Sequence, residues 1–521
     1  MHPAASLLGL LILAACLPAR GAEDRVEPGR RIYEQGITLG GEPLRASGVG
    51  DSSLSGAMAA CTACHRRSGM GSREGRSAVS PVTGPILYAK TVPYQPNRPG
   101  RAAQQFVPLR QDSRAAYDDA SLVRAIRNGI DPDGRQLDAL MPRYELGNAD
   151  AAALVAYLRG LSAAPVQGLE QGVLHLATIV TPDADAARSA VVIEALTTWA
   201  RSGALGGIPL DLQVWKLEGP PTGWTEQLRG LYRSRPVYAV LSGAGRAQWA
   251  PVRDFCEQAG LPCLFPIVDL APSEPGDFYT MYLSRGVPLE ARMLARHLGE
   301  LEPRPARVLQ LVADEAGEAA ARLLTDELGG AAIETRIWRA ESPSSAIADL
   351  QPGDALVGWL RPAQVQALAE ARPQGVPGAR IVLSAQLAPP QKTVLPLAWR
   401  RDARWVSAHS DPARVHGKGV LGLAPWASHM KLPLEQEALL SEIYAATYFF
   451  GDALARMRGH WGREFLLETL EAAHYTRPAG SAFFSLSLAA GQREAAKAGH
   501  LLGFGGPDFR EVVVFGPRLT P

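Results

Sequence analysis

The sequence predicts a multidomain protein, in which a helical N-terminal region is followed by a larger α/β region with two lobes. The chain has 521 residues, which is more than one hydrophobic core usually organises and suggests roughly two to four folding units. Residues 162–168 have the composition of a linker. Beyond them, short apolar runs alternate with helical stretches, as they do in parallel βα units.

The first residues predict an exported, periplasmic chain. Residues 7–15 form an apolar run that is far shorter than the roughly 20 residues needed to span a bilayer. We interpret residues 1–22 as a signal peptide. Residues 13–16 resemble the lipobox of bacterial lipoproteins, whose cysteine, here Cys16, would carry a lipid anchor. Cleavage after small residues near positions 19–21 would release a soluble protein instead, and both routes stay open.

The charge balance argues against one class of partner. Lysine and arginine together number 53 and aspartate and glutamate 52, so no large net field attracts the chain to nucleic acid or to an anionic membrane. We therefore expect no nucleic-acid partner, and contact with a membrane only through a lipid anchor on Cys16.

A short motif carries the strongest chemical signal. Cys61-Thr62-Ala63-Cys64-His65 has the spacing that attaches c-type haem, with two thiols for the vinyl groups and an adjacent imidazole for the iron. A redox dithiol or part of a zinc site is the alternative, but no second Cys/His pair lies nearby to complete four zinc ligands. The motif occurs once, so we expect one covalent haem c.

The second axial ligand is predicted to be Met141. Met58 and Met70 are too close to the motif to reach the opposite face of the haem easily, and no histidine occurs between His65 and His175. Pro142 follows Met141, and an expected helix at 148–161 supplies an apolar stripe. The alternative is a core methionine that fills a gap between helices.

Residues 29–161 resemble a class I cytochrome c domain, with a first helix at 29–33, the haem motif, Met141-Pro142 and a last helix at 148–161. The resemblance implies an all-α domain at 27–163 that transfers single electrons. A Pro- and Gly-rich stretch at 77–114 departs from the family pattern and lengthens the His65-to-Met141 separation to 76 residues. With both axial positions filled, catalysis at the iron is disfavoured.

The other two cysteines are expected to pair. Cys256 and Cys263 flank a Gly260-Leu261-Pro262 turn and could form a local disulfide if that turn brings their Cα atoms within range. The alternative is two buried free cysteines acting as small apolar side chains. An oxidising compartment favours the disulfide.

Residues 172–516 follow an expected linker at 164–171 and read as two series of strands and helices. The expected strands are 173–180, 210–215, 237–241, 308–312, 333–338, 355–360 and 380–383. The expected helices include 184–200, 224–232, 246–259, 289–298, 317–328 and 434–458. This order, together with residues 238–245, 255–266 and 306–313, resembles the type I periplasmic solute-binding proteins, which include the branched-chain amino-acid binding proteins. The resemblance implies a ligand between two lobes.

Ligand contacts are expected where strands end and helices begin. Ser242 and Gly243 lie in a Ser-Gly-Ala-Gly stretch before the helix expected to start near Arg246, and Asp269 and Tyr279 are further candidates. A plain glycine-rich turn, a turn residue and a half-buried aromatic are the alternatives. In the amino-acid binders of this family, an acidic residue of the second lobe usually contacts the ammonium group of the ligand. The loop after 380–383 has no carboxylate, so an amino-acid ligand is not supported. The spacing of His409, His416 and His429 does not match a helical metal-ligand pair.

The sequence has no nucleophile elbow, phosphate loop or dinucleotide-binding motif that would favour an enzyme. Three functions are consistent with it. The first is an electron-transfer protein whose second domain binds a small ligand or docks a redox partner, such as a dehydrogenase. The second is a solute-binding or sensing protein of a transporter with an accessory haem domain. The third, a haem-based oxidoreductase, is not excluded.

Overall fold

The computed structural model describes residues 23–74, 77–91, 113–203, 208–329, 333–339, 342–409, 422–472, 483 and 486–521. The expected signal peptide, Cys16 and His416 lie outside these residues. The chain divides into two compact units, unit 1 (Met1–Ala164) and unit 2 (Pro165–Pro521), and each is described by itself.

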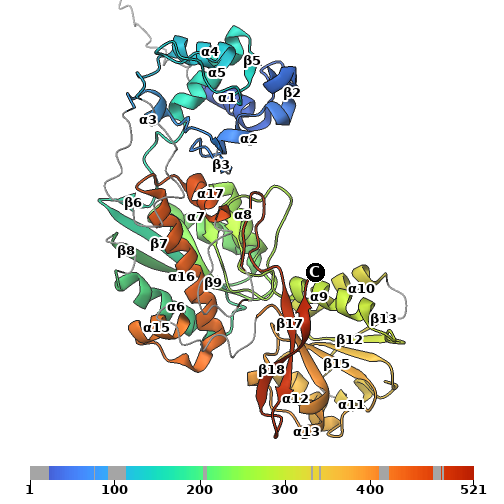
Figure 1. The fold of residues 1–521 in the computed structure, drawn as a ribbon. Coiled ribbons are helices and arrows are strands. Elements are labelled where there is room, and N and C mark those ends of the chain that lie inside the picture. Colours follow the sequence, from blue (N-terminus) through green and yellow to red (C-terminus); the bar gives the residue numbers. More distant parts are fainter. Residues whose placement is uncertain are drawn as a thin grey trace, which may run out of the picture. The chain divides into compact units, whose positions relative to one another are not determined.

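Unit 1 is built around two packed helices, α1 (Glu23–Gln35) and α5 (Asn148–Gly160) (Figure 1). Their backbones approach closely at Gly29, where an added Cβ would overlap the Ala153 carbonyl. The Tyr33 and Tyr157 rings pack beside this crossing, with centroids 5.3 Å apart. The remaining helices are α2 (Thr62–His65), α3 (Gly84–Leu87) and α4 (Asp119–Asn128).

Unit 1 is not all-α, which corrects the expectation from its sequence. Strands β1 (Arg45–Ser47), β2 (Ser53–Ser55) and β5 (Arg143–Glu145) form a small antiparallel sheet in the order β2-β1-β5, and β3 (Arg73–Glu74) pairs with β4 (Ser77–Ala78). Ala46 pairs with Tyr144, and both are buried. The sheet therefore ties the segment after Met141 to the segment after α1.

Within the Pro- and Gly-rich stretch of unit 1, Thr91 and Arg114 pair with each other. Thr91 N–H donates to Arg114 O (2.9 Å), and Arg114 N–H donates back to Thr91 O (3.3 Å). The Arg114 guanidinium also donates to the Ile86 and Leu87 carbonyls. Because the two ends are paired, the long His65-to-Met141 separation in sequence does not require a long separation in space.

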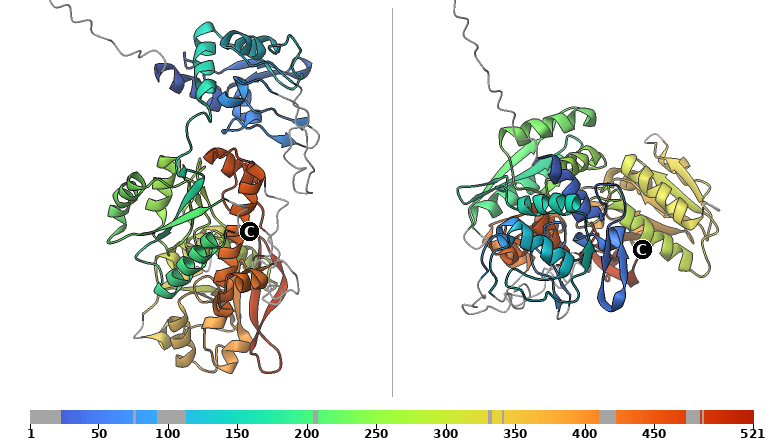
Figure 2. Two further views of the ribbon diagram at one scale, coloured as in Figure 1. Left: turned by 90° about the vertical axis from the view of Figure 1, so that its left-hand side faces the viewer. Right: turned by 90° about the horizontal axis from the view of Figure 1, so that it is seen from above.

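The first lobe of unit 2 contains a mostly parallel sheet in the order β11-β10-β9-β7-β6, with β8 beside β7. Its strands are β6 (Leu169–Glu170), β7 (Val173–Val180), β8 (Leu210–Lys216), β9 (Ala239–Ala244), β10 (Cys263–Leu264) and β11 (Thr280–Met281). Its helices are α6 (Ala186–Arg201), α7 (Trp224–Ser234), α8 (Ala250–Ala259), α16 (Glu437–Met457) and α17 (Arg463–Glu471). Helix α16 lies along this sheet beside α6 (Figures 1 and 2).

The second lobe contains a seven-stranded sheet in the order β13-β12-β14-β15-β16-β17-β18. Its strands are β12 (Val308–Val312), β13 (Ile333–Ile337), β14 (Ala355–Trp359), β15 (Arg380–Ser384), β16 (Ala403–Ser407), β17 (Gly499–Gly505) and β18 (Glu511–Leu519). Its helices are α9 (Val287–Glu300), α10 (Glu315–Leu328), α11 (Pro343–Ala346), α12 (Pro362–Ala371) and α13 (Leu397–Asp402), and α15 (Leu423–His429) precedes α16. Strands β7 and β12 have the bounds expected from the sequence, whereas the antiparallel pair β17–β18 was not expected.

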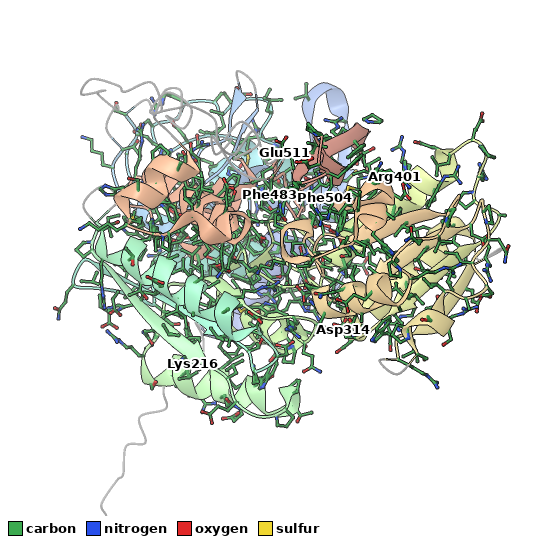
Figure 3. The ribbon with its side chains drawn as sticks, turned by 90° about the horizontal axis from the view of Figure 1, so that it is seen from below. Lys216, Asp314, Arg401, Phe483, Phe504 and Glu511 are labelled. Atoms are coloured by element: carbon green, nitrogen blue, oxygen red, sulfur yellow. A yellow bond between two sulfur atoms is a disulfide. The ribbon has the colours of Figure 1, made fainter. Side chains whose placement is uncertain are left out.

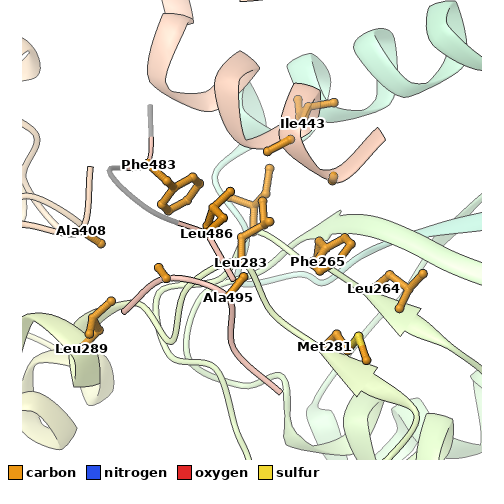
Figure 4. Close-up of a cluster of buried hydrophobic side chains, with 14 of the residues drawn as sticks. Leu264, Phe265, Met281, Leu283, Leu289, Ala408, Ile443, Phe483, Leu486 and Ala495 are labelled. Carbon is orange, nitrogen blue, oxygen red and sulfur yellow. The ribbon is translucent and has the colours of Figure 1, made fainter. Parts of the chain in front are cut away.

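One hydrophobic cluster extends from the first lobe into the second. It includes Leu264, Met281 and Ile443 on the first-lobe side and Leu289 and Ala408 toward the second (Figure 4). This shared core supports the chain segments that cross between the lobes.

Candidate functional site

The haem motif lies on a single helical turn. Cys61 is the N-cap of α2, and His65 is its last residue; the His65 N–H donates to the Cys61 carbonyl at 2.8 Å. Cys61 is half-buried and Cys64 exposed, and neither forms a disulfide. Both thiols are therefore available for thioether bonds.

The His65 imidazole is held in the state that binds a metal. Its side chain is buried, and Nδ1 lies 2.9 Å from the Ser80 carbonyl. Nδ1–H donates to this carbonyl, which leaves the Nε2 lone pair for iron. Burial lowers the pKa of His65 below its usual value, and the smaller opposing effect of the Ser80 hydrogen bond does not cancel it. The ring is therefore neutral near pH 7.

Unit 1 has three methionines among the described residues, and Met141 is one of the two that are half-buried. Among the described methionines of this unit, Met58 is 67% exposed, and the backbone N–H of Met70 is tied to the Ser68 hydroxyl. Met141 packs against the same hydrophobic cluster as Cys61. Two free thiols, an oriented neutral imidazole and a half-buried thioether form a donor set that fits haem c.

The Ser242–Gly245 stretch of unit 2 is closely packed. Ser242 is buried with φ +55°, and among the described residues its hydroxyl has no hydrogen-bond partner. A Cβ at Gly243 or Gly245 would meet the Trp249 ring. The Gly245 N–H donates to the Ile267 carbonyl at 3.2 Å. The stretch thus forms the closely packed end of strand β9, where the pairing with β7 shifts register between Ala177 and Ile179.

Helix α8 begins at Ala250, four residues later than expected. The backbone N–H groups of Arg246 and Gln248 donate to the Asp183 carboxylate at 3.2 and 3.4 Å. These N–H groups, which follow the predicted Ser-Gly-Ala-Gly site, therefore bind an acceptor of the chain itself.

Asp269 is the centre of a charged chain that joins the two lobes, here called the interlobe chain, which consists of Arg188, Asp269, Arg361 and Asp314. Asp269 is fully buried. Arg188 Nη1 lies 3.1 Å from Asp269 Oδ1, and Arg361 Nη1 lies 2.7 Å from Asp269 Oδ2. Arg361 also contacts Asp314, labelled in Figure 3, at 2.7 Å.

The charges of the interlobe chain offset one another. Burial alone would raise the pKa of Asp269, but the guanidinium groups of Arg188 and Arg361 outweigh burial and hold that pKa below its usual value. Asp269 is therefore ionised at neutral pH, with one cation from each lobe. Sequence reasoning named Asp269 but missed both arginines, which lie 81 and 92 residues away in the chain.

Gln386 and Glu290 extend this cluster. Gln386 Nε2 donates to the Val268 carbonyl and to Asp269 Oδ1, each at 3.3 Å. The Gln386 backbone N–H donates to Glu290 at 2.9 Å, and the Ser384 hydroxyl also contacts this carboxyl group. Burial raises the pKa of Glu290 to about 8. The loop after β15 thus lacks a carboxylate of its own but binds the carboxyl group of α9.

Tyr279 does not join these residues. It precedes β11, whereas Asp269 follows β10, and the two strands are parallel. Tyr279 therefore lies at the opposite end of the strands, where its hydroxyl donates to Glu464 at 2.7 Å.

The other predicted residues have local partners. Cys256 and Cys263 form a disulfide with a Cα–Cα distance of 6.2 Å. His409 packs against Phe483 and lies 3.5 Å from Glu442, and His429 is exposed. No group of metal-ligating side chains gathers among the described residues.

Comparison with known proteins identifies the class of each part. Residues 55–162 match the family model described as Cytochrome c. Similar solved structures include a leucine-binding protein from Thermotoga maritima (13% identity, TM-score 0.50, 67% of this chain and 99% of that one). A branched-chain amino-acid transporter protein from Thermus thermophilus with bound valine is similar at 12% identity (TM-score 0.51, 67% and 97%). A fatty-acid transporter binding protein from Thermomonospora curvata is similar at 16% identity (TM-score 0.51, 68% and 94%).

The chain therefore contains a cytochrome c domain, and its α/β part has the fold of the type I periplasmic binding proteins. No curated protein matches the chain by sequence. Within the described residues, no helix combines the length and the apolar character needed to span a membrane.

Proposed function

We propose that the protein is a periplasmic c-type cytochrome that carries single electrons on one covalent haem, with a second unit that binds a small ligand or docks a redox partner. The observation that carries this proposal is the buried His65, whose Nδ1 is engaged by Ser80. Cys61 and Cys64 would hold the haem, and His65 and Met141 would fill its axial positions.

The residues of unit 1 favour electron transfer over catalysis. When bound, haem c supplies a one-electron couple, and a thioether opposite an imidazole favours its reduced state. With two protein ligands in place, the iron keeps no open position for a substrate. Met141 is the residue on which this distinction depends.

The fold of unit 2 supports binding of a small ligand, and the pairing of Asp269 limits which kinds of ligand could bind there. The similar structures are described as binding leucine, valine or fatty acids, so the fold alone names no ligand. Ser242, Gly243 and Asp269 remain the proposed contacts. Asp269 is already paired with Arg188 and Arg361, which leaves no free carboxylate there for a ligand ammonium group.

Export of the chain fits both units. The Cys256–Cys263 disulfide suits an oxidising compartment, and two of the solved structures of similar fold are described as transporter proteins. A signal peptide at 1–22, with or without a lipid anchor on Cys16, would deliver the protein to the periplasm. A dehydrogenase is a suitable electron donor there.

The test is an optical spectrum of the protein purified after periplasmic expression. The oxidised form should show the weak far-red band of a methionine–ferric haem, and Met141→Ala should abolish it. Met70→Ala, which removes another half-buried methionine of unit 1, is the matched control and should keep the band. High-spin ferric features in the unmodified protein would instead indicate an open iron site and favour a haem-based oxidoreductase.

The alternative is a solute-binding or sensing protein of a transporter with an accessory haem, which the similar transporter proteins favour. Tight binding of a small solute, with no electron exchange with any periplasmic dehydrogenase, would support it over the first proposal.

A further inference from the structure

The segment that carries Met141 is folded back onto the end of α4. This helix ends at Asn128, and Gly129 follows in the left-handed region with φ +69°. The Leu137 N–H donates to the Gly129 carbonyl at 2.8 Å, and Ile130 and Gln136 form an antiparallel bridge. The chain thus returns to its starting point before it reaches Met141.

Arg143 fastens this segment from one side. Its guanidinium donates through Nη1 to the Met141 carbonyl and through Nη2 to the Leu137 carbonyl, the latter at 3.3 Å. It lies directly over Gly129, where an added Cβ would overlap it. The fork of the guanidinium therefore connects the residue proposed as axial ligand to the base of its own loop.

The Arg143 charge has no acidic partner among the described residues, since its guanidinium donates to carbonyl groups. The side chain is half-buried, so water screens the charge only in part. A positive charge next to the Met141 backbone destabilises an oxidised, more positive centre relative to its reduced form. Arg143 can thus act both on the position of Met141 and on the electrostatics beside it.

We propose that Arg143 is a positioning residue, which holds the Met141 backbone for axial ligation and raises the reduction potential through its unpaired charge. This inference rests on the proposed ligation by Met141. It assigns the geometric effect to the two hydrogen bonds and the electrostatic effect to the charge, so different substitutions separate the two.

The geometric effect is tested by the affinity of the ferric holoprotein for imidazole, which must displace Met141 to bind. Arg143→Leu should tighten imidazole binding by roughly tenfold or more, because hydrogen bonds from a charged donor each contribute at about that level. Arg114→Leu is the matched control, since Arg114 donates to the backbone carbonyls of Ile86, Leu87 and Ala115 rather than to Met141, and it should leave the affinity unchanged.

The electrostatic effect is tested by redox titration of two further variants. Arg143→Lys keeps the charge but not the fork, so it should tighten imidazole binding while the potential stays close to that of the unmodified protein. Arg143→Gln removes the charge, so its potential should fall below that of Arg143→Lys. If Arg143→Leu yields no holoprotein, the imidazole affinity and the reduction potential are both measured on the Lys and Gln variants.

Unchanged imidazole affinity in all Arg143 variants would overturn the positioning role, and equal potentials in the Lys and Gln variants would overturn the electrostatic one. A failure of the proposed function looks different. In that case the unmodified protein lacks the methionine band, and Met141→Ala binds imidazole no more tightly than the unmodified protein.

Discussion

The two units handle charge at their candidate sites in opposite ways. In unit 1, a short motif and one distant methionine present donors without acidic partners, and the nearby Arg143 charge contacts only carbonyl groups. In unit 2, the interlobe chain alternates cation and anion across the lobes, and each arginine in it contacts a carboxylate. The donors of unit 1 therefore need a bound group to complete their site, whereas the charges of the interlobe chain are paired with one another inside the protein.

The two units can be followed separately in one sample. All ten tryptophans of the chain lie between residues 199 and 461, so tryptophan fluorescence reports the unfolding of unit 2. Haem absorbance reports unit 1.

The largest effect is expected from Cys61→Ser combined with Cys64→Ser. Without either thiol the covalent attachment should be lost completely, because no thioether bond can form. Haem staining after denaturing electrophoresis measures this, and the tryptophan unfolding curve should not move. The paired replacement of Cys256 and Cys263 serves as control and should retain the stain; covalent haem in the Cys61/Cys64 variant would contradict the proposed attachment site.

Asp269→Asn should destabilise unit 2 by about 3–5 kcal/mol, because removing one member of a buried ion pair leaves the others uncompensated. Urea unfolding followed by tryptophan fluorescence measures the loss, while the haem spectrum should remain that of the unmodified protein. Glu226→Ala removes an exposed partner of Arg229 at 3.6 Å and should cost less than about 1 kcal/mol. Equal losses of unfolding free energy in the two variants would show that the interlobe chain does not stabilise unit 2.

Replacement of Cys256 and Cys263 by alanine should lower the unfolding free energy of unit 2 by about 2–3 kcal/mol. The disulfide closes a loop with a sequence separation of 7 residues, and a loop this short restricts the unfolded chain by about that amount. Adding a reductant to the unmodified protein should reproduce the shift. If the reductant lowers the unfolding free energy of the unmodified protein and of the alanine variant equally, loss of the disulfide is not the cause of the shift.

The smallest effect, taken per pH unit, is a dependence of the stability of unit 2 on pH that comes from Glu290. Its folded pKa of about 8 lies above the ordinary value of 4.5, so between these values the folded state holds a proton that the unfolded state has lost. The stability of unit 2 should therefore fall as pH rises through this window, by up to about 1.4 kcal/mol per pH unit.

Glu290→Gln tests this dependence, because a neutral amide does not titrate. The variant should show a flatter stability profile between pH 5 and 8, measured by urea unfolding at each pH. Glu226→Gln, at an exposed position, should keep the slope of the unmodified protein. An unchanged slope in Glu290→Gln would assign the pH dependence to other groups.

The sequence predicted most of the α/β order because its strands are mostly buried apolar runs that alternate with helical stretches, as β7 and β12 do. It did not predict the three-residue strands of unit 1, since the pairing of Ala46 with Tyr144 joins segments almost a hundred residues apart. The later start of α8 follows from the Asp183 carboxylate, which binds the Arg246 and Gln248 N–H groups.

The candidate sites were predictable to different extents. Cys61, Cys64 and His65 are adjacent in sequence, so their spacing alone indicates the chemistry. Arg188, Arg361 and Glu290 approach Asp269 and Gln386 only through the packing of two lobes. Each occurs in an ordinary helix-forming context, which gives no local signal of its partner.

The paired ends of the long stretch in unit 1 make it a natural position for engineering. Thr91 and Arg114 bind each other through both of their backbone groups, so the described chain resumes at the point where it left off. Loop-closure entropy changes slowly with length. A change in the length of chain between Thr91 and Arg114 is therefore expected to leave their pairing and the redox properties intact, which makes this interval a position for a tag that tethers the protein to an electrode.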